Sequence, residues 1–192
     1  ITDLKKLQGL PEQALLSAKA MASRHNQIGY RFGLDFPSYY AIMTYAQDAN
    51  LRQTFYEAYV TRASDQSIAK QWDNTKNMET LLAYRDQLAK LLGLKDYAEY
   101  SLSTKMAHTS AEVIDFLDNL VKLTKPRALV EYQELESFEK TQREAPLNPW
   151  DIAFYTEKLR KQRYDISPEE LRPYFPISQV LKGMFKIVEI LY

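Results

Sequence analysis

Helix-period patterning constrains the fold of this chain more than any other feature of its sequence. From Pro37 onward, apolar residues recur three or four positions apart, which is the spacing of one face of an α-helix. Local signals divide the pattern into separate helices. Thr109 with Glu112 and Ser167 with Glu170 have the spacing of capping boxes, and Gly93 is a typical C-terminal stop. Five glycines are few for a sheet-rich fold. The chain is therefore predicted to be mainly α, a multi-helix array.

One segment departs from the helical pattern. Tyr30, Phe32 and Leu34 alternate with Arg31, Gly33 and Asp35. Alternation of apolar and polar residues is typical of a half-buried strand. The sequence therefore predicts one short β-strand near residues 29–35.

Several of the predicted helices carry specific expectations. Asp48 is predicted to cap a helix that carries Leu51, Phe55, Tyr56 and Tyr59. A long helix over 68–92 is predicted to turn one set of side chains towards a core: Trp72, Met78, Leu81, Leu82, Leu88 and Leu92. The helix that begins after Thr109 contains Pro126, which lacks an amide and clashes with the preceding turn. We expect a kink or a short break there.

Composition restricts the class of protein. At 192 residues the chain is long enough for one large domain or two small ones. Lys and Arg together number 25, as do Asp and Glu, so the charge balance favours neither nucleic acid nor an anionic membrane as a partner. There is no cysteine, which excludes disulfides and thiol chemistry. No apolar run approaches the roughly 18 residues of a membrane span.

The sequence predicts no metal site and no catalytic site. Zinc needs several His, Cys, Asp or Glu side chains at fixed spacing, and only His25 and His108 are present as histidines. His108 and Glu112 are four residues apart, but the capping box places His108 before the helix, off the face of Glu112. The chain has no G-x-S-x-G elbow, and neither histidine has the signature of a general base. We interpret both histidines as exposed residues near helix ends.

Other polar and aromatic residues are interpreted structurally. A solvated helix face accounts for a charged run: Glu131, Glu134, Glu136 and Glu139 with Lys140 and Arg143. The fourteen tyrosines are compatible with a peptide-binding wall, but packing in a core or at its rim is the preferred interpretation for Tyr56, Tyr59, Tyr84, Tyr132 and Tyr155. Arg62 and Asp73 are assigned to buried ion pairing between helices in preference to substrate contact.

The C-terminal helix is apolar on most sides. Its apolar residues are Val180, Leu181, Met184, Phe185, Ile187, Val188, Ile190, Leu191 and Tyr192. Such a helix suits burial all round. The chain is therefore expected to expose an apolar patch near residues 180–192 or to hide it by self-association.

Short blocks along the chain resemble the thimet oligopeptidase family of zinc metallopeptidases, and within it the bacterial oligopeptidase A branch. The blocks cover nearly the whole chain in family order: Gly9–Glu12, Leu34–Tyr39, Thr61–Asp65, Trp72–Asn74, Lys105–Ala107, Trp150–Asp151 followed by a tyrosine, Tyr174–Pro176 and Leu181–Phe185. The resemblance places the partner of the predicted strand just before Ile1.

The resemblance implies that residues 1–192 are a single helical fragment from the pre-catalytic half of a larger peptidase. The family's zinc signature HExxH lies beyond Tyr192, so zinc is implied for the parent and none for this fragment. The implied parent is a cytoplasmic endopeptidase that hydrolyses short peptides with a zinc-activated water. This part would supply channel wall and support for the missing catalytic half, would itself be inactive, and would bind neither nucleic acid nor membrane. A self-standing helical interaction module is the alternative.

Overall fold

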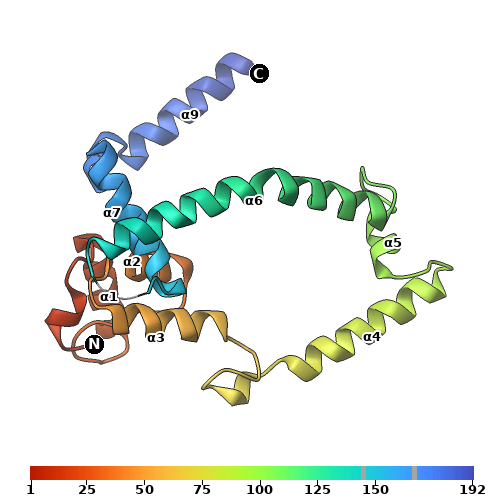
Figure 1. Ribbon diagram of the computed structural model, residues 1–192, viewed down its shortest axis with the longest axis horizontal. Coiled ribbons are helices and arrows are strands. Elements are labelled where there is room, and N and C mark those ends of the chain that lie inside the picture. Colours follow the sequence, from red (N-terminus) through yellow and green to blue (C-terminus); the bar gives the residue numbers. More distant parts are fainter. Residues whose placement is uncertain (144–145, 166–167) are drawn as a thin grey trace. The chain divides into compact units, whose positions relative to one another are not determined.

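The computed structural model describes residues 1–143, 146–165 and 168–192, and in these ranges the chain consists of helices joined by turns and loops (Figure 1). The prediction of a mainly helical fold is confirmed. The chain divides into two compact units. Unit 1 comprises Ile1–Phe55 and Ala145–Tyr192, and unit 2 comprises Tyr56–Glu144, so the boundary falls inside one helix.

Unit 1 is assembled from two separate parts of the sequence. Its first part contains η1 (Leu4–Leu7), α1 (Glu12–Arg24), α2 (Phe36–Tyr45) and the first half of α3 (Ala49–Val60). Its second part contains η3 (Pro149–Asp151), α7 (Ile152–Tyr164), α8 (Pro168–Leu171), η4 (Arg172–Tyr174) and α9 (Ile177–Leu191). The two parts meet where α2 packs against α7.

The core of unit 1 lies among η1, α2 and α3. Its buried side chains are Leu7, Leu10, Ile42, Ala46 and Leu51. Phe32 and Phe55 pack at its edge with their rings edge to face, 6.3 Å between centroids. As predicted, the Asp48 carboxylate caps α3 by accepting a hydrogen bond from the Leu51 amide at 3.0 Å.

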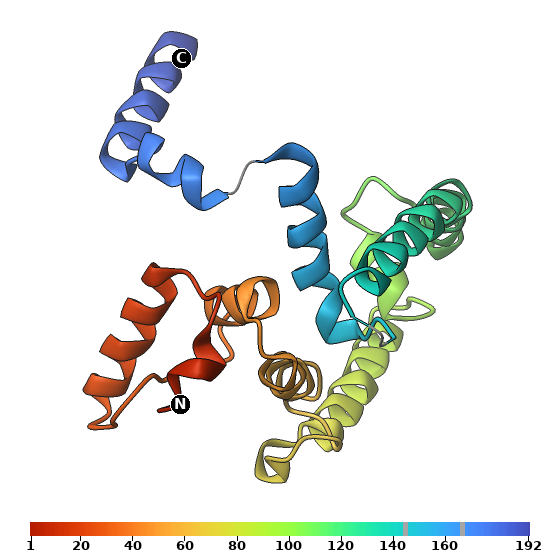
Figure 2. The same cartoon turned by 60° about the vertical axis from the view of Figure 1, so that its left-hand side comes forward.

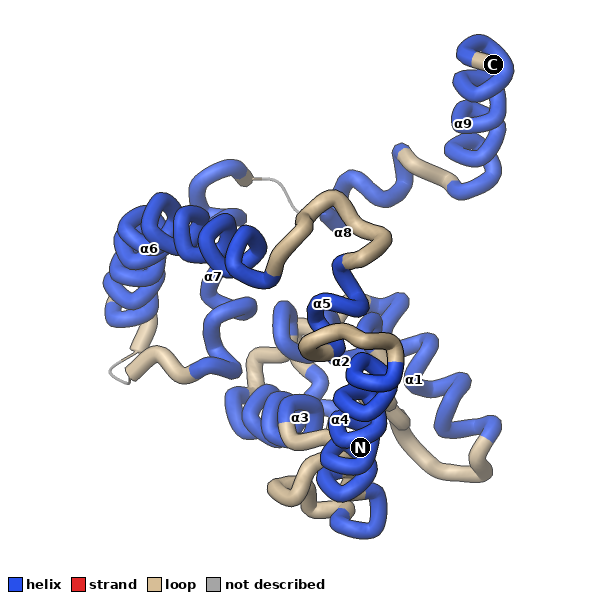
Figure 3. Tube along the Cα trace, turned by 90° about the vertical axis from the view of Figure 1, so that its right-hand side faces the viewer, coloured by secondary structure: helices blue, strands red, loops and turns tan. Residues whose placement is uncertain are grey.

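The predicted strand over 29–35 is wrong, because the described residues contain no β-strand (Figure 3). One antiparallel pair is present: the Ile1 amino group donates to the Tyr30 carbonyl at 2.7 Å, and the Tyr30 amide donates to the Ile1 carbonyl at 2.9 Å. The next amide, that of Arg31, donates instead to the Ala18 carbonyl of α1 at 3.0 Å. A ladder needs successive pairs, and a single pair leaves the segment as an extended loop.

Gly9, in the turn after η1, allows this turn to approach the backbone at the end of α2 closely. Its φ is +88°, and a Cβ at this position would lie 2.2 Å from the Tyr45 carbonyl oxygen. The neighbouring Gln47 amide donates to the Gln8 carbonyl at 3.0 Å and holds the two segments together. Only glycine fits this conformation and this contact without displacing backbone.

Asp35 caps the N-terminus of α2. Its carboxylate accepts a hydrogen bond from the Ser38 amide at 3.0 Å. That hydrogen bond holds the pKa of Asp35 below its ordinary value of 3.8. Because the folded-state pKa is lowered, the ionised cap stabilises the fold fully above pH 3.8, and its contribution disappears as the pH falls through the folded value.

We therefore expect Asp35→Ala to lower the free energy of unfolding by about 1 kcal/mol at pH 7 and by progressively less below pH 4, where the wild-type cap is itself being protonated. Urea denaturation across a pH series measures the difference. Asp35→Asn is the matched control, because an amide caps at every pH and should show no such pH dependence. An Asp35→Ala cost that stays constant down to pH 2 would contradict this role.

Unit 2 is a succession of helices: η2 (Lys70–Trp72), α4 (Thr75–Leu91), α5 (Tyr97–Leu102) and α6 (Ser110–Lys140), with α5 packed against both α4 and α6. Gly93 ends the α4 region with φ +77°, as predicted. The single helix predicted over 68–92 is wrong at its start, because residues 70–72 form η2 and α4 begins only at Thr75. The core face predicted for it is wrong as well, because all six side chains expected there are exposed, from Leu88 at 40% to Trp72 at 70%. The apolar residues have helical spacing, as predicted. Among the described elements, however, α4 packs mainly against α5, and this face stays exposed.

Pro126 lies inside α6, which runs without interruption from Ser110 to Lys140. The expected break is therefore absent, while Figure 1 shows α6 arched rather than straight. Bending accommodates a residue that cannot donate to the preceding turn. The predicted cap at its start is confirmed, since the Glu112 amide donates to the Thr109 hydroxyl at 3.2 Å. The Glu112 carboxylate accepts instead from the amide of His108, at 2.8 Å, and not from the Thr109 amide that a capping box uses.

The C-terminal elements agree in part with the sequence. The capping box predicted for Ser167 and Glu170 involves Ser167, which lies outside the described residues. The α9 helix begins at Ile177 and forms a single uninterrupted helix to Leu191 (Figure 2).

Candidate functional site

The two histidines are exposed and lie beside helix ends, as predicted. His25 directly follows α1 in unit 1, and His108 precedes α6 in unit 2. Among the residues that the structure describes, no three His, Cys, Asp or Glu side chains come together in a way that could hold a metal ion. We therefore derive no catalytic step through zinc from the described residues.

The charged run near the end of α6 is only partly a solvated face. Glu131 is exposed and pairs with Arg127 at 2.8 Å, and Glu136 pairs with Lys140 at 3.5 Å. Glu139 contradicts the prediction, since it is fully buried and accepts a hydrogen bond from Arg143 Nε at 2.6 Å. The buried Leu135 lies one helical turn before it, so both residues belong to the same covered face.

The tyrosines divide between packed and exposed positions. Tyr155 is buried in unit 1, and Tyr56 and Tyr59 are half-buried, as the packing interpretation predicts. Tyr84 and Tyr132 are 65% and 43% exposed, so the core or rim interpretation is wrong for them. They stand on α4 and α6, whose apolar faces are exposed as well.

The assignment of Arg62 and Asp73 to buried ion pairing between helices is wrong, because both residues are exposed. The Arg62 guanidinium stacks over the Tyr59 ring, 4.8 Å from its centroid. The Asp73 carboxylate accepts hydrogen bonds from the Thr75 amide at 2.9 Å and the Thr75 hydroxyl at 2.6 Å. These bonds lower the pKa of Asp73, the hydroxyl contributing most.

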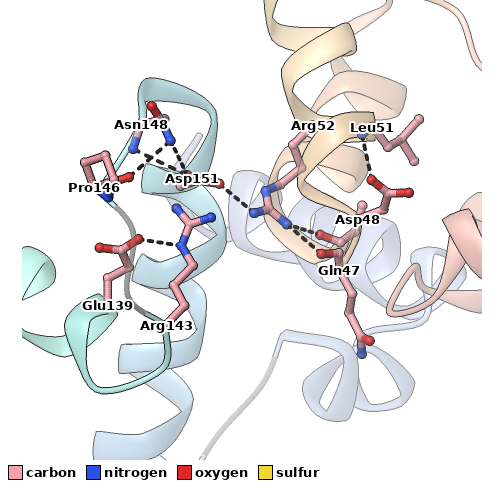
Figure 4. Close-up of polar contacts among 10 residues, drawn as sticks. Gln47, Asp48, Leu51, Arg52, Glu139, Arg143, Pro146, Asn148 and Asp151 are labelled. Atoms are coloured by element: carbon pink, nitrogen blue, oxygen red, sulfur yellow. Dashed lines mark hydrogen bonds and ion pairs between the residues drawn. The ribbon is translucent and has the colours of Figure 1, made fainter.

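A buried ion pair between Arg52 and Asp151 joins the two sequence segments of unit 1 (Figure 4). The Arg52 Nη2 to Asp151 Oδ1 distance is 2.6 Å, and both side chains are almost completely buried. Arg52 Nη1 also donates to the Ala46 carbonyl at 2.6 Å and the Gln47 carbonyl at 3.2 Å. The other carboxylate oxygen of Asp151 accepts from the amide and the side chain of Asn148, at 3.3 and 3.2 Å. Arg52 thus links the end of α2 to the start of α7.

Sequence reasoning missed this pair. Arg52 lies on α3 between helix-forming residues and has no local signal, whereas Asp151 belongs to the Trp-Asp block that carries the family resemblance. The two residues are 99 positions apart. Their pairing depends on the packing of α2 against α7, which no local pattern specifies.

Two cations lie against the ring of Phe154. The Arg52 guanidinium carbon is 4.1 Å from the ring centroid, and the Lys158 ammonium is 4.6 Å from it. Burial lowers the pKa of Lys158, and the positive charge of Arg52 lowers it further. Both cations therefore contact one aromatic ring, and the contact made by Arg52 joins α3 to Phe154 of α7.

A cavity of about 350 Å³ lies between α1, the 31–35 segment and α2 in unit 1. Its walls are mainly apolar, with the polar residues Gln13, Ser17, Arg31, Asp35, Ser38, Tyr40 and Tyr45 among them. Asp35 is engaged as the cap of α2, and Arg31 donates to Gln27 at 2.9 Å. The cavity offers space for a side chain or a small ligand, but its lining residues include no paired nucleophile and base.

The apolar face of α9 is the other prominent surface. It consists of Ile177, Val180, Leu181, Met184, Phe185, Ile187, Val188, Ile190, Leu191 and Tyr192, each at least 44% exposed. The predicted apolar patch near residues 180–192 is thereby confirmed. In the ranges that the structure describes, no helix is long and apolar enough to span a membrane.

Comparison with known proteins gives concordant matches. Residues 42–192 match peptidase family M3. Across its full length the chain is 47% identical to oligopeptidase A of Salmonella typhimurium and 46% identical to oligopeptidase A of Escherichia coli, and it spans 28% of the length of each. It is also 38% identical over its full length to a probable cytosolic oligopeptidase A of Arabidopsis thaliana, again spanning 28% of that protein.

Proposed function

Because the chain belongs to peptidase family M3, we propose that it is a non-catalytic helical portion of a zinc-dependent oligopeptidase that hydrolyses short peptides. The similarity to oligopeptidase A along the whole chain, over little more than a quarter of that protein, is the observation that carries this proposal. Residues 1–192 would be one part of the pre-catalytic half, and the HExxH region would lie outside them.

The role of this portion is structural. Its helices would form part of the wall of the peptide channel and support the catalytic region. The exposed apolar faces of α4, α6 and α9 support this role, because such faces are normally covered by further protein. Zinc would be held by residues outside this chain, since the ligand types present here do not converge in its described part.

The partners follow from the same proposal. Short peptides would be substrates of the parent, and the remaining part of the parent would be the partner of this chain. The equal numbers of acidic and basic residues give no support to a nucleic-acid or membrane partner. A cytoplasmic location is supported by the relative in Arabidopsis that is named a probable cytosolic oligopeptidase A.

A self-standing helical interaction module is the second candidate. The cavity in unit 1 and the exposed apolar face of α9 favour it, because both offer binding surfaces without catalytic groups. In that case the isolated chain would bind a partner and would make no contribution to peptide hydrolysis.

A chimaera separates the two candidates. This chain would replace the aligned segment of Escherichia coli oligopeptidase A, and turnover of a quenched fluorescent short peptide would be measured with and without a chelator. We expect chelator-sensitive hydrolysis by the chimaera and none by the isolated chain supplied with zinc. Chelator-sensitive turnover by the isolated chain would refute a non-catalytic role. A chimaera that is unfolded by circular dichroism, or folded but inactive, would favour the interaction module.

A further inference from the structure

The apolar face of α9 has a regular internal spacing. Ile177, Leu181, Met184, Val188 and Leu191 follow one another at intervals of four, three, four and three residues. This is the spacing of the central seam of a helix that packs along its length against other helices. All five side chains are exposed. The helix therefore carries a complete packing seam that no described residue buries.

The flanks of this seam are apolar as well. Val180, Ile187 and Ile190 lie along one side, and Phe185 and Tyr192 lie along the other. In two-stranded coiled coils these flanking positions usually carry charges that pair across the interface. Here the charged residues Lys182, Lys186 and Glu189 are confined to the opposite side of the helix. The apolar arc spans about 220° of the circumference, at 3.6 residues per turn.

An arc of this width is wider than one neighbouring helix covers. A single packed helix buries a stripe of roughly 100° or somewhat more. Pairing with one α9 of a second copy would bury the seam but leave much of the flanks in water. The exposed apolar surface is on the order of 1,000 Å², well above the few hundred Å² that soluble monomers leave open. Cover on both flanks requires at least two apolar neighbours.

We propose that α9 is a two-sided docking helix, whose seam and both flanks are covered by at least two apolar helices from the part of the oligopeptidase that lies outside this chain. The inference rests on the proposed function. The relatives are more than three times as long as this chain, so such a protein has ample further sequence to supply these helices. The polar stripe of α9, with Lys182, Lys186 and Glu189, then remains in water.

Thiol labelling tests the proposal at single chosen positions, because this chain contains no cysteine of its own. Phe185→Cys and Ile187→Cys place one probe on each flank, and Lys186→Cys places the control on the polar stripe. Each variant is made in the isolated chain and in the chimaera with Escherichia coli oligopeptidase A, in which any cysteine outside the chosen position is replaced by serine. Labelling rates are measured with a water-soluble maleimide, and peptide hydrolysis is measured on the same samples.

We expect all three thiols to label at similar rates in the isolated chain at low concentration. In the active chimaera, both flank thiols should label at least about tenfold more slowly, while Lys186→Cys keeps its rate. An active chimaera in which either flank thiol remains reactive would overturn two-sided docking and leave the proposed function standing. Protection of both flanks in the isolated chain as its concentration rises would assign the face to a second copy instead. A chimaera inactive even without the cysteine substitutions would remove the proposed function, and the inference with it.

Discussion

Replacing Arg52 by methionine is expected to lower the free energy of unfolding by about 3–5 kcal/mol, because it leaves the Asp151 carboxylate buried without its counter-charge. Arg52 also supplies the donors to the Ala46 and Gln47 carbonyls and the stacking contact with Phe154. A loss of this size is a large fraction of the roughly 5–15 kcal/mol that stabilises a typical domain. Urea denaturation followed by circular dichroism gives the difference.

Two further variants make this result specific to the buried pair. Arg127→Met removes an ion pair at an exposed position, 2.8 Å from Glu131, and should cost no more than about 0.5 kcal/mol. The double variant Arg52→Met/Asp151→Leu should be less destabilised than Arg52→Met alone, since no unpaired charge remains buried. If Arg52→Met and Arg127→Met had similar effects, the pair would not anchor unit 1.

Gly9→Ala is expected to cost about 3 kcal/mol or more, since it combines two unfavourable effects. The φ of +88° is disfavoured for alanine, and the new Cβ would lie 2.2 Å from the Tyr45 carbonyl oxygen. That oxygen belongs to the backbone at the end of α2, so relief requires η1 and α2 to separate. Thermal and urea unfolding both report the change.

Gly93→Ala is the matched control for this prediction. Gly93 also has a positive φ, of +77°, but no atom lies within 4 Å of the position that its Cβ would occupy. Its replacement should therefore cost only the left-handed conformation, about 1–2 kcal/mol. Equal losses for the two variants would show that the contact with Tyr45 contributes nothing.

Features encoded within a few neighbouring residues were predictable from the sequence. Asp48 and Thr109 cap their helices as expected, because the cap and its amide lie three residues apart. Gly93 likewise adopts the left-handed conformation that its position after an apolar helix predicts. The helical class follows from many such local agreements.

Features that depend on distant parts of the chain were not predictable. The 29–35 segment has the alternation of a strand, yet only Tyr30 pairs with Ile1. The next amide, that of Arg31, donates to the Ala18 carbonyl of α1. Glu139 pairs with an arginine four residues away, as the exposed Glu131 does, and only tertiary packing buries it. Trp72 and Met78 have a core-like spacing but no cover. In each case the local pattern is present, and the deciding partner lies elsewhere or is not among the described residues.

The two-part sequence of unit 1 sets an order for folding during synthesis. Unit 2 is one continuous stretch, and its helices contact their neighbours in sequence, so they can form as the ribosome releases them. Unit 1 has to wait, because Arg52 leaves the ribosome 99 residues before Asp151. Until α7 emerges, the Arg52 guanidinium has no Asp151 carboxylate with which to pair. The surface of α2 that packs against α7 is then exposed and can bind chaperones.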